Sequence, residues 1–463
     1  MSVLSLRFSG TSLFRLGLIA ILNLPAASLF ATMYTPLDYG ARLDGSTSDR
    51  AALQAAIDAA HAAGGGTVVV PAGRKLMSGS IQLKSRVTLH LEPGSRLVAS
   101  TERADYLDRA LIQALDAEDI AITGEGTIDG RGVAFMKEEL PHIFRPADWR
   151  PRLIIFEGCR RVRVRDVTLR DSPSWTLHLA GCEDVTVHGI SILNHLKIPN
   201  CDGINPDHSR NVRISDCHIE AGDDGIVLKS TRAYERYGPC ESITVTNCTI
   251  TSSSAALKIG TETVGVIRDV VFSNCVVRNS HRGVAIVLRD EGSIENVLVE
   301  NLVIETRLLH PDWWGAAEPI YISARPRSAG GRLGTVRGLR FRQILARGEG
   351  GVFVEGSPGR PIEDLRMEDV SVDWSRAGGR LEGRIDVRPP ESLGTTVEGV
   401  AAFRVRGVND VRLRDIRVRW PAVRPEGAVA VEAHGEGVVV EGLREDTAER
   451  VPEAEQIKRI PER

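Results

Sequence analysis

The feature that most constrains the fold is a short repeated pattern, in which apolar residues at alternating positions are followed by Asp, Asn or Gly. Six copies begin at Val162, Val185, Val212, Ile243, Val270 and Val297, at intervals of 23, 27, 31, 27 and 27 residues. Later copies begin at Leu339, Leu365 and Val411. Short strands that recur at this period without a helix between them predict a solenoid, in which each coil stacks on the previous one.

The solenoid that fits this pattern is all-β, a single-stranded right-handed parallel β-helix. Leucine-rich repeats share the period but need a Leu/Asn consensus that is missing here, and β-propellers need longer units. Ahead of the strands, an Ala-rich stretch from Asp49 to about Ala63 predicts a helix, with Leu53, Ile57 and Ala60 on one face. We expect this helix to cap the amino-terminal end of the β-helix, because uncovered strands invite aggregation.

The two ends of the chain differ from the repeats. Arg7 and Arg15 precede an apolar run from Leu16 to Leu24 and then small residues, which predicts a signal peptide over residues 1–31 and a periplasmic or extracellular protein. A membrane anchor is the weaker reading, because the apolar run is short for a bilayer span. We expect the catalytic β-helix over residues 32–443 and a charged, solvated tail over 444–463.

The composition of the chain limits the kinds of partner and cofactor that we expect it to bind. The 58 basic and 61 acidic residues nearly balance, so no nucleic-acid partner is indicated, and we expect a monomer. Cys217, Cys248 and Cys275 stand at the same place in the repeat, which favours a stack of small buried side chains. The seven cysteines have no CxxC spacing, and no motif in the chain indicates a metal or organic cofactor.

Three carboxylates are expected to meet on neighbouring coils. When the coils are aligned on Leu177, Ile204, Ile226, Leu257 and Ile286, one column contains Trp175, Asp202, Asp224, Ala255 and Val284. Strands one coil apart lie about 4.8 Å from each other, so Asp202 and Asp224 should be neighbours with Asp223 beside them. Crowded acids can hydrolyse a glycosidic bond, since crowding raises the pKa of the acid that must hold a proton. Backbone hydrogen bonding at turns and calcium binding are the alternatives.

Three motifs resemble the pectin-degrading polygalacturonases, glycoside hydrolase family 28. They are Asn200-Cys201-Asp202, Gly222-Asp223-Asp224 and the stretch from Ser172 to His178, and the resemblance covers roughly residues 34–330. It implies a right-handed parallel β-helix that hydrolyses with inversion and without a cofactor. By position, it implies that Asp223 is the general acid and that Asp202 and Asp224 hold and activate the water.

The chain departs from this family at two motifs. Ser254-Ala255-Ala256 stands where Gly-His-Gly is common, and Ala285-Ile286-Val287 stands where Arg-Ile-Lys is common. The usual supporting histidine and the usual cations for a substrate carboxylate are therefore absent. We expect other side chains to bind the substrate: Trp175, His178, Asn205, Lys229, Lys258, His281, Arg289, Trp313 and Trp314.

These observations predict an exported inverting glycosidase that acts on pectin or a related acidic plant polysaccharide or its oligosaccharides. Galacturonides and rhamnogalacturonan fragments are the candidate substrates. A loop that carries Trp313 and Trp314 would block one end of the groove and make cleavage exo-acting. Two alternatives remain: a β-elimination lyase that uses calcium and a base, and a non-catalytic carbohydrate-binding β-helix, which Ala255 and Ala285 would suit.

Overall fold

The computed structural model describes residues 32–107, 109–311, 313–357, 359, 362–374, 383–386, 395–446 and 456–461. The predicted signal peptide lies outside this part of the chain. No helix among the described residues has the length and apolar character needed to cross a membrane.

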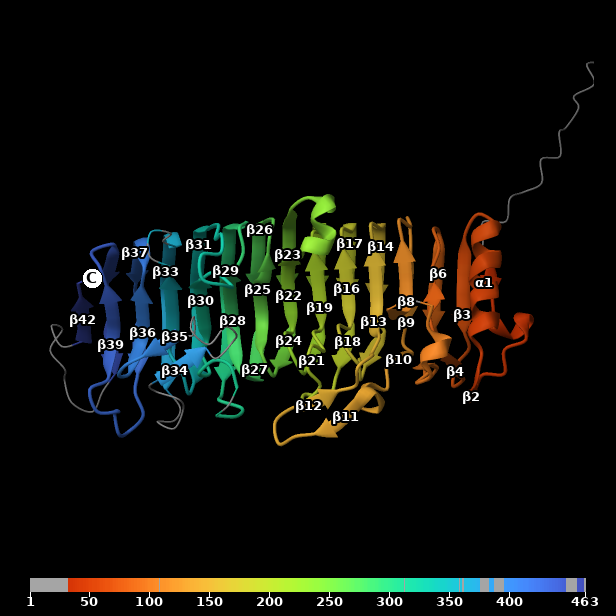
Figure 1. Ribbon diagram of the computed structural model, residues 1–463, viewed down its shortest axis with the longest axis horizontal. Helices are drawn as coiled ribbons and strands as arrows, with labels where there is room; N and C mark the ends of the chain where they lie inside the picture. Colours follow the sequence, from red (N-terminus) through yellow and green to blue (C-terminus); the bar gives the residue numbers. More distant parts are fainter. Residues whose placement is uncertain are drawn as a thin grey trace, which may run out of the picture. The chain divides into compact units, whose positions relative to one another are not determined.

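Each coil of the β-helix contains three short strands. In one coil they are β16 (Leu177–Ala180), β17 (Glu183–His188) and β18 (Ser191–Leu193), and in the next β19 (Ile204–Asp207), β20 (Arg210–Ser215) and β21 (His218–Ala221). Every strand pairs in parallel with its counterpart one coil away. Figure 1 shows the strands in one continuous row from α1 to β42, which confirms the predicted parallel β-helix.

The strands of one face form sheet 1, which carries the candidate site. In spatial order its described strands are β5 (Ile81–Gln82), β8 (Ala110–Leu115), β13 (Arg152–Glu157), β16, β19, β22 (Ile226–Ser230), β25 (Ala255–Thr263), β28 (Arg282–Leu288), β30 (Ile320–Ala324), β32 (Val352–Gly356), β36 (Ala401–Arg406), β39 (Val429–His434) and β42 (Ile457–Ile460).

The other faces form sheet 2. Its described strands are β1 (Met33–Tyr34), β2 (Asp44–Ser48), β3 (Gly66–Val70), β4 (Lys75–Ser78), β6 (Val87–Leu91), β7 (Arg96–Ala99), β9 (Ala121–Gly124), β10 (Thr127–Asp129), β14 (Arg160–Arg165), β15 (Thr168–Arg170), β17, β18, β20, β21, β23 (Cys240–Thr246), β24 (Thr249–Ser252), β26 (Val266–Ser273), β27 (Val276–Ser280), β29 (Ser293–Thr306), β31 (Thr335–Gly348), β33 (Ile362–Trp374), β37 (Val408–Arg414), β38 (Arg417–Arg419), β40 (Val438–Glu441) and β41 (Arg444–Asp446).

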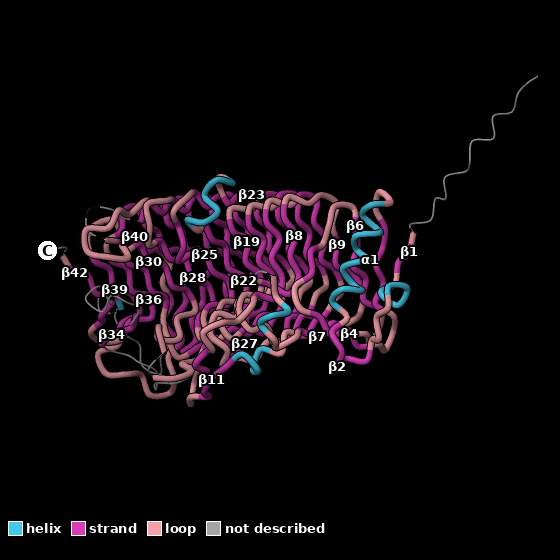
Figure 2. Tube along the Cα trace, turned by 45° about the vertical axis from the view of Figure 1, so that its right-hand side comes forward, coloured by secondary structure: helices cyan, strands magenta, loops and turns pink. Residues whose placement is uncertain are grey.

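The remaining elements lie outside the two sheets. Two antiparallel pairs are β11 (Met136–Glu139) with β12 (Phe144–Pro146), and β34 (Gly383–Asp386) with β35 (Thr395–Val397). The helices are α1 (Arg50–Ala62) and the short 3-10 turns η1 (Pro36–Tyr39), η2 (Arg103–Asp105), η3 (Gly132–Phe135) and η4 (Arg232–Tyr237). Figure 2 shows the longer loops gathered on one side of the stack, near β11 and β27.

The Asp, Asn or Gly that ends each repeat has a structural reason. These residues adopt left-handed backbone, with φ of 66° at Asp166, 59° at Asp216 and 56° at Asn247. Most L-residues avoid this region because Cβ crowds the following carbonyl oxygen, whereas Asn, Asp and Gly tolerate it. The Asp, Asn or Gly of each repeat therefore marks the turn between two consecutive strands of a coil.

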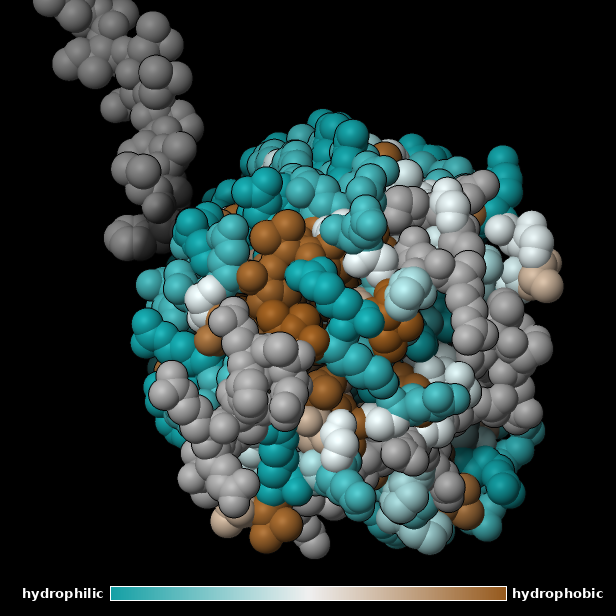
Figure 3. Space-filling view, turned by 90° about the vertical axis from the view of Figure 1, so that its left-hand side faces the viewer, coloured by the Kyte–Doolittle hydropathy of each residue, from teal (hydrophilic) through white to brown (hydrophobic). Residues whose placement is uncertain are grey.

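Apolar residues fill the interior, and α1 covers the amino-terminal end. Leu53, Ile57 and Ala60 of α1 are buried against the same core as the inward residues of the strands, as predicted. Figure 3 views the opposite end and shows hydrophobic residues visible between hydrophilic ones. All seven cysteines are buried and unbridged, and Cys217, Cys248 and Cys275 follow one another in the ladder, which confirms the predicted stack.

Two stretches of the segment 444–463 are strands rather than a solvated tail. Arg444–Asp446 pairs with β38, and Ile457–Ile460 pairs with β39. Ile457 packs against the core, which gives this otherwise charged segment an apolar contact. The predicted tail is thus wrong for these residues, which extend the β-helix.

The predicted alignment is also wrong at β28, by two residues. Leu257 pairs with Val284 rather than with Ile286, so Ala255 has Arg282 as its neighbour. Arg282, and not Val284, therefore continues the column of Asp202 and Asp224.

Asn247 offers a test of the turn that defines the repeat. Replacing Asn247 by Val should lower the free energy of unfolding by about 1–2 kcal/mol, because a β-branched residue is strained in left-handed backbone. Asn247→Gly is the matched control and should cost much less. Chemical denaturation of the purified proteins measures both, and equal losses for the two variants would contradict this account.

Candidate active site

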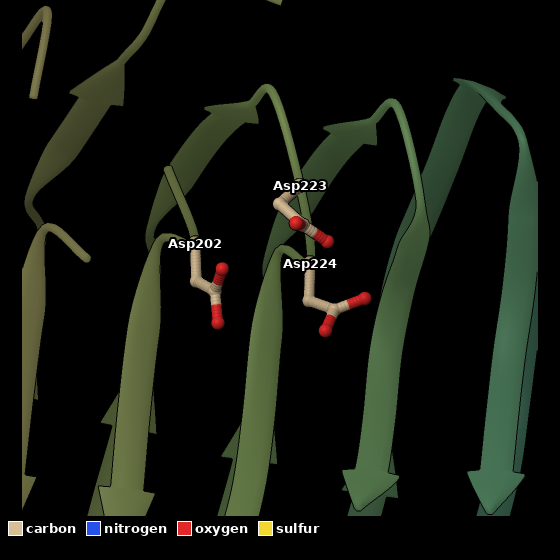
Figure 4. Close-up of side chains that lie close together, drawn as sticks. All are labelled: Asp202, Asp223 and Asp224. Atoms are coloured by element: carbon tan, nitrogen blue, oxygen red, sulfur yellow. The ribbon is translucent and has the colours of Figure 1, made fainter. Parts of the chain in front are cut away.

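The three predicted acids come together on the outer side of sheet 1. Asp202 precedes β19, and Asp223 and Asp224 precede β22 on the next coil (Figure 4). The backbone ladder continues between them, since Gly203 N donates to Asp224 O at 2.9 Å. One carboxylate oxygen from each residue lies within 4.8 Å of the other two. A point at the centre of such a triangle is at most about 2.8 Å from each oxygen, which is hydrogen-bonding distance for a water.

The glycine after each coil's acid permits this close stacking. A Cβ on Gly203 would lie 2.4 Å from Gly225 O, and a Cβ on Gly225 would lie 2.5 Å from Ala256 O. Real Cβ atoms do not come this close to backbone oxygen, so a side chain at either position would push the coils apart. The Asp-Gly sequence at Asp202 and Asp224 is therefore a packing requirement of the site.

The acids are nearly buried, and burial controls their charge. Asp202 and Asp224 are 2% exposed, and Asp223 is 9% exposed. Burial, and then repulsion from Asp224, raises the pKa of Asp223 to about 6. Burial raises the pKa of Asp202 to about 8, with repulsion from Asp223 and Asp224 adding to the effect and Lys229 opposing it. At neutral pH the cluster therefore retains a proton, as a general acid requires.

Two buried lysines balance the charge of the acids. Lys258 Nζ donates to Asp224 Oδ2 at 2.7 Å. Lys229 Nζ lies 3.0 Å from Glu262 Oε2 and 3.7 Å from Asp202 Oδ2. Burial alone would lower the pKa of Lys229, but Glu262 and Asp202 outweigh it and raise the pKa above its usual value.

Two residues outside the predicted set hold Asp223. Asn200 donates its backbone N to Asp223 Oδ2 at 3.1 Å. Arg150 in turn donates Nη2 to Asn200 Oδ1 at 2.7 Å and Nη1 to Pro173 O at 3.0 Å. Asn200 stands in the motif that identified Asp202, but Arg150 lies in an irregular segment with no repeat to indicate its role. Arg150 therefore positions Asn200, and the backbone N of Asn200 in turn holds Asp223.

Five of the nine predicted substrate-binding residues lie at the acids or next to them. Asn205 Nδ2 donates to Asp202 Oδ2 at 2.6 Å, and Lys229 and Lys258 make the contacts described above. Trp175 is half-buried, and its ring centroid lies 4.9 Å from Lys229 Nζ. Trp314 is also half-buried, and its Nε1 donates to Ser254 Oγ at 3.2 Å, one residue before Ala255.

The other four do not reach the acids as expected. His178 is fully buried and bonded to Asp207, and His281 is fully buried and bonded to Trp314 O. Trp313 is 3% exposed and stacks on Trp314, so its ring offers no face to a sugar. Arg289 stands at the far end of β28 and is mostly buried. Hydrogen bonds hold the two buried histidines and aromatic stacking holds Trp313, which argues against direct sugar contact for these three side chains.

The acid cluster is a poor cation site. Its three oxygens could in principle surround a metal ion. Lys258 occupies one Asp224 oxygen, and Lys229 approaches Asp202, so two ammonium groups already supply the positive charge. These contacts favour acid–base chemistry over calcium binding.

A family comparison agrees with this geometry. The model of Glycosyl hydrolases family 28 matches residues 62–378, which is more than half of the chain. The chain belongs to glycosyl hydrolase family 28. Among curated relatives of this family 28 chain, a "Probable polygalacturonase" of Vitis vinifera is 33% identical over 277 residues, which cover 54% of this chain and 55% of that protein. The chain spans about half the length of the curated relatives it matches.

Solved structures support the fold of the family 28 chain. An exopolygalacturonase from Thermotoga maritima superposes with a TM-score of 0.62 at 23% identity, over 89% of this chain and 92% of that one. PfbA, a surface adhesin of Streptococcus pneumoniae, superposes with a TM-score of 0.53 at 17% identity, over 90% and 93% of the two chains. At these identities the likeness concerns the fold alone, and this fold occurs both in an exopolygalacturonase and in an adhesin.

The two departures from the family 28 pattern lie together in the structure. Ala255, Ala285 and Val287 lie in a single apolar cluster with Ala316 and Tyr321. Ala316 belongs to residues 307–319, the segment between β29 and β30, which also carries Glu318 to within 2.8 Å of Arg282. Small apolar side chains at Ala255 and Ala285 fit against this segment.

The raised pKa of Asp202 predicts a trend in stability with pH. Since folding raises this pKa from about 3.9 to about 8, the neutral carboxyl contributes stability that is present below about pH 4 and lost as the pH rises to about 8. Asp202→Asn cannot ionise, so its melting temperature minus that of the wild type should increase from pH 4.5 to pH 8. Differential scanning fluorimetry measures this difference. Asp184→Asn, at an exposed turn, is the control, and a flat difference for Asp202→Asn would contradict the assigned cause.

Proposed function

We propose that this chain hydrolyses glycosidic bonds in pectin-type polysaccharide or its oligosaccharides. The observation that carries the proposal is the triangle of three carboxylate oxygens within 4.8 Å around a water-sized point. Membership of family 28 and the similarity to proteins named polygalacturonase support the substrate class. Rhamnogalacturonan fragments are a narrower proposal of the same kind. We also propose that the enzyme is exported and monomeric.

The three acids have different tasks in this proposal. Asp223, the most exposed of the three and protonated up to about pH 6, gives its proton to the leaving glycosidic oxygen. Asp224, which accepts a hydrogen bond from Lys258, takes a proton from the attacking water. Asp202, whose neutral form is favoured, orients that water while Asn205 fixes its carboxyl. Asp202 and Asp224 thus have different tasks here, whereas the motifs alone assign both of them to the water.

Replacing Asp223 by Asn tests the general acid. The variant keeps the size of the side chain but cannot donate a carboxyl proton, so kcat on pectic oligosaccharides should fall about 100- to 10,000-fold. Wild-type kcat should also decline as the pH rises above about 6, because Asp223 then loses its proton. Release of reducing sugar measures both effects. Activity of Asp223→Asn within a few-fold of wild type would show that the acid is misassigned.

The contacts of the acids favour inversion. One oxygen of each acid lies within 4.8 Å of the others, which is shorter than the roughly 6.5–9.5 Å between carboxyl groups that is usual for inverting enzymes and closer to the roughly 5–5.5 Å of retaining ones. Direct attack by a carboxylate is nevertheless disfavoured, because Asp202 is predominantly neutral and Asp224 is bound by Lys258 and by Ala255 N. Water is the remaining nucleophile, and its single displacement inverts the anomeric centre.

Nuclear magnetic resonance of the first product tests this stereochemistry. We expect the new anomeric centre to appear with the configuration opposite to that of the cleaved linkage, before mutarotation mixes the two forms. Deuterium-exchanged protein and a short oligosaccharide allow the anomeric protons to be followed within minutes. Initial release of the same configuration would instead support a covalent intermediate.

The segment 307–319 supports exo-action. It covers Ala255 and Ala285 immediately beside the acids and is fixed by the buried ion pair of Arg282 with Glu318. A polysaccharide cannot run through a groove that is covered on one side of the cleavage point. We therefore propose that the enzyme removes short products from chain ends.

Product size and viscosity distinguish exo- from endo-action. With polygalacturonan, mass spectrometry should detect one short product from the earliest times, while viscosity falls slowly relative to the reducing ends formed. Early appearance of a ladder of many sizes would contradict the proposal. Unsaturated products that absorb near 235 nm and vanish with a chelator would favour a lyase, and glycan binding without turnover would favour a non-catalytic protein.

A further inference from the structure

A row of side chains leads away from the acids across sheet 1. Gln82, Gln113, Ile155, His178 and Asn205 occupy the same position on β5, β8, β13, β16 and β19, each paired with the next. Asn205 holds Asp202, so this row starts at the acids and runs toward the capping helix α1 (Figure 1). At about 4.8 Å per strand, Gln82 lies about 19 Å from Asn205.

The far end of this row is a pocket. It has a volume of about 130 Å³, and its lining includes Gln82, Arg109, Gln113 and Ile155. Tyr234 of η4 forms a wall of it, with its ring 5.3 Å from that of His178. Within the described residues, the side-chain amides of Gln82 and Gln113 make no hydrogen bond. Each amide can donate and accept, as recognition of sugar hydroxyls requires.

A cation and an aromatic ring lie between the pocket and the acids. The Arg152 guanidinium lies 4.6 Å from the centroid of the Trp175 ring. Along the stack of coils, Arg152 comes before Trp175, and Lys229, which also contacts this ring, comes after it. Arg152 Nη1 is buried and has no hydrogen-bond partner among the described residues. An unpaired buried guanidinium nitrogen is costly, and a carboxylate is its natural partner. Trp175, half-buried, offers a face on which a sugar ring can stack.

The opposite direction along sheet 1 is covered. Past Asp224, the same column continues with Ala255 and then with the buried Arg282, which is paired with Glu318. Ala255 packs with Ala316 and Tyr321 in one apolar cluster. The two sides of the acids therefore differ: amides, a guanidinium and a half-exposed indole lie toward α1, and buried, packed side chains lie toward the carboxyl-terminal coils.

We propose that a linear uronic-acid oligosaccharide extends from the acids only toward α1, and that Gln82 and Gln113 form a distal sugar subsite at the end of this path. Arg152 and Trp175 form the intermediate subsite, which binds a sugar that carries a carboxylate. This inference rests on the proposed hydrolase function, and it adds a dependence on substrate length that the acids alone would not give.

A series of galacturonide oligomers from two to six units tests the distal subsite. In the wild type, kcat/KM should rise with length until the chain spans the roughly 19 Å to Gln82. In the double variant Gln82→Ala/Gln113→Ala, the ratio of kcat/KM for the longest to the shortest oligomer should fall about 10-fold, since two net hydrogen bonds are lost. Arg163→Ala, exposed on β14 of the neighbouring coil face, is the control and should keep the wild-type ratio.

Two outcomes would overturn the proposal. One is a wild-type kcat/KM that does not change with length, and the other is a double variant with the wild-type ratio. If no oligomer is cleaved, the hydrolase proposal fails by itself, and titration calorimetry with the six-unit oligomer still decides on the subsite. A Kd that the double substitution leaves unchanged in that titration excludes the distal subsite.

Discussion

The parallel ladder between β19 and β22 is the constraint on which the site depends. Gly203 N donates to Asp224 O at 2.9 Å and Ile204 N to Gly225 O at 3.0 Å, so the ladder continues past the strand ends to the acids themselves. The carboxyl groups cannot move apart without breaking these bonds or opening the glycine contact between the coils. The backbone therefore keeps the carboxyl groups together, and burial, with their mutual repulsion added to it, raises the pKa values of Asp202 and Asp223.

Charge at the site is balanced by neighbours in the same stack. Burial of several carboxylates would be very unfavourable alone, and the ammonium groups of Lys229 and Lys258 offset it from strands β22 and β25. Glu262 completes the set, because it binds Lys229 at 3.0 Å. Each lysine thus has a carboxylate partner inside the protein. Among the other cations near the acids, Arg152 has a buried nitrogen without a hydrogen-bond partner in the described residues, and the proposed subsite for a uronic-acid carboxylate uses it.

Most of the fold could be predicted because the repeat reports a local physical requirement. Left-handed turns select Asp, Asn or Gly at a fixed place in each coil, and inward positions select apolar residues, so the period and the column of acids are both visible in the sequence. The alignment failed at β28, where Val284, Ile286 and Leu288 alternate. An apolar pattern of period two cannot distinguish a register from one shifted by two residues.

The parts of the site other than the acids were less predictable, because they lie in irregular segments outside the repeat. Arg150 acts from an irregular segment that has no periodicity, and its partners are mainly backbone oxygens, which leave no mark on the sequence. Trp313 reads as a sugar-binding residue because it stands in a polar loop, yet the loop folds back and packs it against His142. Contacts between excursions from different coils are long-range, and composition alone does not specify them.

The separation between coils and excursions has a consequence for how such a protein can change over time. The acids and their lysines belong to the repeating framework, whereas η4 and the segment 307–319 are inserted between strands that still pair in parallel with the next coil, with one register irregularity between β22 and β25 beside η4. Lengthening or losing one insertion would open or shorten the groove while the proton-transfer apparatus stayed intact. A solenoid of this kind can therefore change its substrate range through its inserted segments, while the repeating framework stays the same.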